Sequence, residues 1–136
     1  MKVLRYLWVG PTTLLGLVLA FALLWRGKVE LIDGVIEAHS PLLRQALTRL
    51  IPLARGADAI TLGHVVIGRS AQALAATRAH ERVHVRQYEL WGPLFVPAYL
   101  IAGLCALAQG RHPYFDNRFE RQAHEEESTF RASVRG

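Results

Sequence analysis

The sequence predicts an α+β fold that is mostly helical with a short sheet and is preceded by an N-terminal transmembrane helix. Residues 7–25 contain no charged side chain, and about 20 apolar residues are enough for a helix to cross a bilayer. Residues 28–39 and 59–68 are rich in β-branched side chains, which favours strands. Residues 41–53 carry apolar side chains at helical spacing.

Composition limits the organisation of the chain. Its 136 residues fit one small domain plus an anchor, so we expect an anchor at residues 1–27 and a domain at residues 28–136. The net charge of +5 and the 51% hydrophobic content favour membrane lipid as a partner. The basic residues are scattered and lack a recognisable nucleic-acid-binding motif, so no nucleic-acid partner is expected. Cys105 is the only cysteine, which excludes an internal disulfide.

The N-terminal run has the flanks of a membrane anchor. Basic and aromatic residues stand near its ends, as they do at membrane interfaces: Lys2, Arg5, Tyr6, Trp8, Trp25, Arg26 and Lys28. The alternative is a signal peptide cleaved near Ala20-Phe21-Ala22. Residues 23–25 keep the run apolar beyond that point, so we predict an uncleaved, single-pass membrane anchor.

The predicted body contains a short sheet and several helices. Asp33-Gly34 predicts a hairpin within residues 28–39, and residues 59–68 predict one strand after a turn at residues 55–58. A helix is expected from a cap at Ser70 or Thr77 to about Leu90. A second, polar helix is expected at residues 117–130.

The pentapeptide His80-Glu81-Arg82-Val83-His84 is the feature most closely tied to chemistry. Residues four apart share one face of a helix, so two imidazoles there can reach one Zn²⁺. Glu81 between them can take a proton from a zinc-activated water. A catalytic zinc site needs a third protein ligand, and the downstream candidates are His112, Asp116, Glu120 and His124.

The H-E-x-x-H segment followed by Glu120-Arg121-Gln122-Ala123 resembles the gluzincin group of zinc metallopeptidases, especially its small single-domain members. The resemblance covers about residues 60–124. It implies a zincin-like minimal domain with His80, His84 and Glu120 as zinc ligands and Glu81 as general base. It also implies that a strand at about residues 60–68 lines the substrate groove, and that Ala123 allows close helix packing.

The position after Glu81 departs from that group, because it is usually apolar and is Arg82 here. Arg78, Arg82 and Arg86 form a row at four-residue spacing, and like charges in such a row are mildly destabilising. We expect these side chains to face solvent or to pair with anions, for which lipid phosphates are one source. The acidic run 125–127 is interpreted as a solvated face.

Several other polar residues have two interpretations. Gln87 and Tyr88 follow the two histidines on the same face, where they can hydrogen-bond a ligand or simply pack. Tyr114 or His124 can stabilise an oxyanion or play a structural part. For His64 a core or edge position is favoured over metal ligation, and His39 and His112 are expected in loops.

Two functions from different classes fit the sequence. The first is a membrane-anchored zinc metallopeptidase that hydrolyses peptide bonds of a peptide or protein substrate, with Glu81 as general base. The second is a non-catalytic membrane protein whose structural metal site supports binding to a protein partner or to anionic lipid. In either case one metal can bind both His84 and Glu120 only if residues 91–108 do not cross the bilayer. Gly92, Pro93, Pro97 and Gly103 interrupt that run, and we predict that it is not transmembrane.

Overall fold

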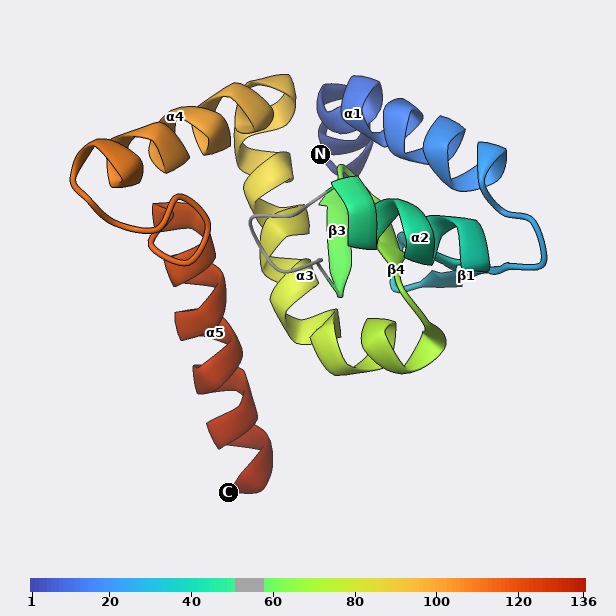
Figure 1. The fold of residues 1–136 in the computed structure, drawn as a ribbon. Coiled ribbons are helices and arrows are strands. Elements are labelled where there is room, and N and C mark those ends of the chain that lie inside the picture. The colour runs from blue at the N-terminus through green and yellow to red at the C-terminus, as the bar shows by residue number, and fades with distance from the viewer. Residues whose placement is uncertain (51–57) are drawn as a thin grey trace.

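The computed structural model describes residues 1–50 and 58–136, and its fold is α+β, as predicted (Figure 1). The elements in chain order are α1 (Lys2–Ala22), β1 (Lys28–Ile32), β2 (Val35–His39), α2 (Pro41–Leu50), β3 (Ala59–Leu62), β4 (Val65–Gly68), α3 (Ala71–Trp91), the 3-10 turn η2 (Gly92–Leu94), α4 (Phe95–Ala108) and α5 (Arg118–Arg135). The predicted helical residues 51–53 and the predicted turn at residues 55–57 lie outside the described part.

The sheet is mixed, with strand order β1-β2-β4-β3. The hairpin predicted at Asp33-Gly34 joins the antiparallel strands β1 and β2, while β2 runs parallel to β4. The single strand predicted at residues 59–68 is wrong, because this segment folds into the antiparallel pair β3 and β4. The turn between them contains Gly63, whose φ of +65° is readily adopted only by glycine.

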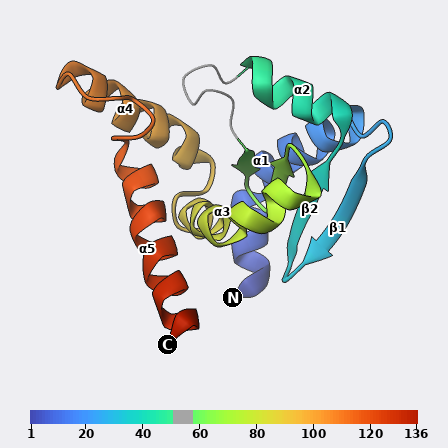
Figure 2. The same ribbon diagram turned by 60° about the horizontal axis from the view of Figure 1, so that its bottom comes forward.

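The sheet has helices on both faces. Val65 of β4 lies in one apolar cluster with Ala20 of α1 and Leu43 of α2. The next residue, Val66, lies in a second cluster with Leu74 and Val85 of α3, since successive strand residues face opposite sides. Helix α3 therefore lies between the sheet and α5, as Figure 2 shows.

Helix α1 packs against the body along its length. Its buried residues are Val9, Thr12, Gly16 and Ala20. A Cβ atom at Gly16 would lie 2.9 Å from the Cβ of Val65 and 3.0 Å from the Leu62 carbonyl oxygen, so only glycine allows this close approach. The helix begins and ends earlier than the predicted span of residues 7–25. Both Lys2–Ala22 and Ala71–Ala108 are long and apolar enough to cross a membrane.

Of the two caps predicted for the helix that carries His80 and His84, Ser70 is the one that begins α3. Its hydroxyl accepts a hydrogen bond from the Ala73 backbone N–H at 3.0 Å, which satisfies one of the free donors at the start of α3. The hydroxyl of Thr77, the other candidate, instead donates to the carbonyl oxygen of Ala73 within the helix. At the other end, Gly92 has a φ of +57° and is covered by the Trp8 ring.

The arginine row of α3 pairs with protein carboxylates. Arg78 makes two hydrogen bonds of 2.9 Å to Glu37, Arg82 donates to the same carboxylate at 3.2 Å, and Arg86 contacts Glu126. Glu37 is 4% exposed and faces α3 from β2. The expected pairing with anions is thus met within the chain, and Arg82 takes the place of an apolar residue because a buried carboxylate faces it.

We predict that Glu37→Gln lowers the free energy of unfolding by about 3 kcal/mol, because it leaves the half-buried Arg82 without its charged partner. Unfolding in urea, followed by circular dichroism, measures this. Glu30→Gln is the matched control. Glu30 lies opposite Glu37 in the register of β1 and β2, but its side chain is exposed. Equal stability of the two variants would contradict the proposed importance of the ion pair.

Candidate metal centre

Three buried side chains converge where α3 meets α5. The Nε2 atoms of His80 and His84 are 3.1 Å apart. Glu120 presents one oxygen 3.1 Å from Nε2 of His80 and the other 3.3 Å from Nε2 of His84. The exposed fractions of these three residues are 7%, 6% and 2%. The sequence-based set of candidate ligands is therefore brought together in space.

The spacing of these donor atoms fits a zinc ion. Zinc binds imidazole nitrogen and carboxylate oxygen at about 2.0–2.2 Å in a tetrahedral arrangement, which places neighbouring donors about 3.3 Å apart. The three observed separations are 3.1, 3.1 and 3.3 Å. The two Glu120 distances join different carboxylate oxygens. One donor atom from each of the three residues lies within 4.8 Å of the others, so small adjustments of the side chains would let the three share one zinc ion.

The electrostatics of the cluster call for a cation. Burial lowers the pKa of His84, but the hydrogen bond and charge of Glu120 outweigh burial and raise that pKa to about 9. Burial alone would raise the pKa of Glu120, yet the hydrogen bonds from His80 and His84 hold it well below its usual range. A buried carboxylate is stable beside a positive charge, which either a proton or a metal ion can supply.

The chain returns to α3 through α4 and the loop that follows it. Asn117 is fully buried; its side-chain oxygen caps α5 by accepting from the Phe119 N–H, and its amide donates to the Tyr99 carbonyl oxygen of α4. Glu120 lies in the first turn of α5. Ala123 is 0% exposed, in line with the close packing expected of a small residue there. Residues 91–108 thus lead back to the same site.

Two neutral groups orient the ligands. The side-chain oxygen of Gln87 lies 2.8 Å from Nδ1 of His84, so that Nδ1–H donates to it and leaves Nε2 free to bind a metal. Gln87 is fixed in turn by donating to the Phe119 carbonyl oxygen. The Tyr99 hydroxyl donates to Glu120 at 2.7 Å. Gln87 therefore contacts a candidate ligand, while its interpretation as a group that supports a bound metal stays a prediction.

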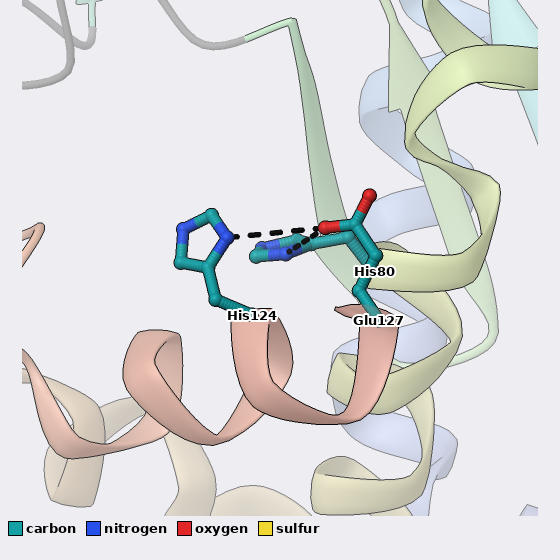
Figure 3. A group of neighbouring side chains, drawn as sticks. All are labelled: His80, His124 and Glu127. Carbon is teal, nitrogen blue, oxygen red and sulfur yellow. Dashed lines mark ion pairs between the residues drawn. The ribbon is translucent and has the colours of Figure 1, made fainter. Parts of the chain in front are cut away.

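His80 is oriented by a carboxylate that the sequence interpretation missed. A carboxylate oxygen of Glu127 lies 3.5 Å from Nδ1 of His80. The other oxygen forms an ion pair with the Arg131 guanidinium at 2.6 Å. His124 lies 3.8 Å from the same carboxylate. Figure 3 shows His124 and Glu127 approaching the His80 ring together from α5.

The group of His80, His124 and Glu127 also has donor atoms within 4.8 Å of one another. A neutral imidazole carries one proton, so if Nε2 of His80 bound a metal, the proton would be on Nδ1, which faces the Glu127 carboxylate at 3.5 Å. This second group therefore supports the first site. Interpreting residues 125–127 as a solvated face is wrong for Glu127, whose side chain is 16% exposed. Its spacing of seven from Glu120 places both on one face of α5.

Glu81 is separate from the three converging donors. It is 5% exposed, and its carboxylate accepts a 2.6 Å hydrogen bond from the Thr61 hydroxyl of β3. Its charge nevertheless reaches the centre, because it contributes to raising the pKa of His84. This position is compatible with a base and leaves the ligand set to the other three residues.

The remaining candidates have structural partners. Asp116 accepts the His112 backbone N–H, and His112 accepts two backbone N–H groups, so both order the loop before α5. His64 is buried at the β3–β4 turn and lies 3.1 Å from Glu89. Burial, Glu120 and Glu81 together raise the pKa of Tyr114 well above its usual range, which keeps it a neutral donor near the centre.

Comparison with protein-family models, with curated proteins and with solved structures found no match to this chain. Its function therefore has to be argued from the residues of the site.

We predict that the purified protein binds about one Zn²⁺ per chain, because the three donors match zinc's preferred ligands and geometry. His84→Ala should lose the metal, whereas His124→Ala should retain it, since His124 lies only in the supporting group. Elemental analysis after gel filtration measures both. Retention by His84→Ala with loss by His124→Ala would place the metal in the other group.

We predict that Glu127→Ala weakens zinc binding about 10- to 100-fold, as is usual when the acceptor behind a histidine ligand is removed. Competition with a chromophoric chelator measures the affinity. Glu125→Ala, an exposed position on the same helix, is the control and should leave it unchanged. An unchanged affinity in Glu127→Ala would show that the His80–Glu127 contact does not support the site.

Proposed function

We propose that this protein is a membrane-associated zinc metallopeptidase of gluzincin-like design that hydrolyses peptide bonds in a peptide or protein substrate. The observation that carries the proposal is the convergence of Nε2 of His80, Nε2 of His84 and the Glu120 carboxylate, with contacts of 3.1–3.3 Å, beside a second carboxylate, Glu81, that is not one of the donors. Three protein ligands with a free fourth position are typical of catalytic zinc, whereas structural zinc has four protein ligands.

Bound zinc in such a site acidifies water and polarises a carbonyl group. The chain's own contribution starts with Glu81. Its carboxylate takes a proton from the attacking water and delivers it to the nitrogen of the leaving amine, so that the peptide bond breaks and the base is restored. The hydrogen bond from Thr61 holds the carboxylate in place. A base that is already oriented costs less entropy when it reacts.

Tyr114 supplies a neutral hydroxyl for the developing oxyanion. It is half-buried, and burial together with the charges of Glu120 and Glu81 raises its pKa above the usual range. A donor whose pKa stays high keeps its proton throughout the reaction and stabilises negative charge on the substrate oxygen.

Strand β3 is the surface on which an extended substrate would bind. It is the last strand in the sheet order, and within the described residues its only strand neighbour is β4. Thr61 connects this strand directly to Glu81. A peptide that added to the free edge of β3 would therefore run beside the base and the metal ligands, with backbone hydrogen bonds providing affinity.

The second candidate function is a non-catalytic membrane protein with a structural metal site that binds a protein partner or anionic lipid. It is favoured by the extent to which the ligands are tied into the packing of α3 against α5. Metal content does not distinguish the two functions, because both require it.

We predict that Glu81→Gln retains zinc and lowers peptide turnover by about 10²- to 10⁴-fold, because the amide cannot accept the water's proton. Cleavage of a quenched-fluorescence peptide library, with zinc measured in the same sample, tests this. Glu89→Gln is the control, as Glu89 lies on the same helix but contacts His64 and Arg5. Wild-type turnover in Glu81→Gln would contradict the assignment, and no turnover in the zinc-loaded wild type would favour the non-catalytic function.

A further inference from the structure

Helices α1 and α4 expose large apolar side chains on the outside of the domain. In Figure 1 both helices lie along the upper side of the molecule, while α3 and α5 run away from it. Leu7, Leu15 and Phe21 of α1 are 69%, 52% and 59% exposed, and Leu100 and Leu104 of α4 are 60% and 65% exposed. Soluble surfaces rarely present so many large apolar side chains together.

The charges around these helices have one sign. Residues 1–29 and 90–115 contain no Asp or Glu, while all 11 acidic residues of the chain lie elsewhere. The same two segments carry five basic residues at or near the helix ends: Lys2, Arg5, Arg26, Lys28 and Arg111. Apolar helices with basic ends complement a surface that is apolar inside and anionic at its boundary, which is the surface of an anionic bilayer.

The tryptophans follow the same distribution. All three in the chain, Trp8, Trp25 and Trp91, lie in these two segments, and their exposed fractions are 46%, 71% and 37%. Tryptophan is enriched at the boundary between hydrocarbon and water because its ring is apolar and its N–H is polar.

Neither helix has the surroundings of a bilayer-crossing span. The apolar run within Ala71–Ala108 is broken at Gly92, whose φ is +57°, and helix α4 beyond it has 14 residues, which is about 21 Å of helix, against about 30 Å of hydrocarbon. Helix α1 is long enough, but the body covers one side of it. The His64 backbone N–H donates to the Thr13 hydroxyl, and Tyr6 stacks on His64. If α1 crossed the bilayer, this polar turn would have to enter the hydrocarbon with it.

We propose that the protein lies on one leaflet of an anionic bilayer, with α1 and α4 as a single membrane-binding surface and neither helix crossing. This arrangement replaces the single-pass anchor expected from the sequence, and it does not depend on the metal centre. A second copy of the chain is the less suitable occupant of this surface, because a symmetric dimer would bring its own five basic residues against an identical set.

The native Cys105, exposed on α4, is a unique site for measuring depth. The full-length protein is labelled there with an environment-sensitive fluorophore and reconstituted into phosphatidylglycerol-containing vesicles that carry nitroxide lipids. A second sample carries the label at α1 in the variant Leu15→Cys, Cys105→Ser. We expect quenchers near the head groups to act more strongly than those near the bilayer centre at both positions.

Two results would overturn the proposal. Stronger quenching at position 15 by the central nitroxide would mean that α1 crosses the bilayer. No quenching at Cys105 would mean that α4 does not touch lipid.

Variants of α4 provide an independent measurement. Leu100→Asp combined with Leu104→Asp should lower partitioning from mild detergent into anionic vesicles by at least tenfold, whereas Leu31→Asp should have no effect. Leu31 is the matched control because it is 72% exposed but lies on β1. Unchanged partitioning of the double variant would exclude α4 from the membrane-binding surface, and a dimer dissociated by the same variant would assign the surface to a second copy.

Discussion

The carboxylate of Glu120, buried between two imidazole rings, is the constraint on which the arrangement of the helices depends. A charge in that position needs a cation and a full set of hydrogen bonds, and these come from α3 through His80 and His84 and from α4 through Tyr99. The Glu120 carboxylate thereby ties α3, α4 and α5 together through contacts with one side chain. The turn at η2 and the cap formed by the buried Asn117 direct the chain so that α5 places Glu120 beside His80 and His84.

Helix α3 connects the metal centre to the sheet because its faces have different polar partners. The face with His80 and His84 meets α5, whereas Arg78 and Arg82 meet Glu37 of β2. Glu81 points toward Thr61 of β3. The candidate ligands His80 and His84 and the candidate base Glu81 therefore lie on one helix, so that a shift of α3 relative to the sheet moves all three together and changes their position relative to β3.

The elements governed by local chemistry could be predicted from the sequence. The Asp33-Gly34 hairpin and the Ser70 cap depend on neighbouring residues, and the structure has both. The convergence of His80, His84 and Glu120 could be predicted from the four-residue spacing of the histidines and from resemblance to the E-x-x-A segment, whereas their role as metal ligands stays a prediction. The β3–β4 turn was missed because Leu-Gly-His has no side chain that favours a hairpin, and only the φ of Gly63 shows it. The contact of Glu127 with His80 and that of Arg82 with Glu37 were missed because the two residues of each pair lie on different elements more than 40 positions apart, which sequence spacing cannot relate.

The packing of α1 links where the protein resides to whether it can fold. Val65 at the centre of the sheet is covered by α1 at the point where Gly16 makes its closest approach. Cleavage after Ala22 would therefore release more than a targeting segment: the sheet would lose the part of its cover that α1 provides beside α2, and the exposed apolar residues of β4 would favour aggregation. The N-terminal helix is thus part of the packed domain as well as a membrane-like segment, and its removal would expose apolar surface that it covers in the folded chain.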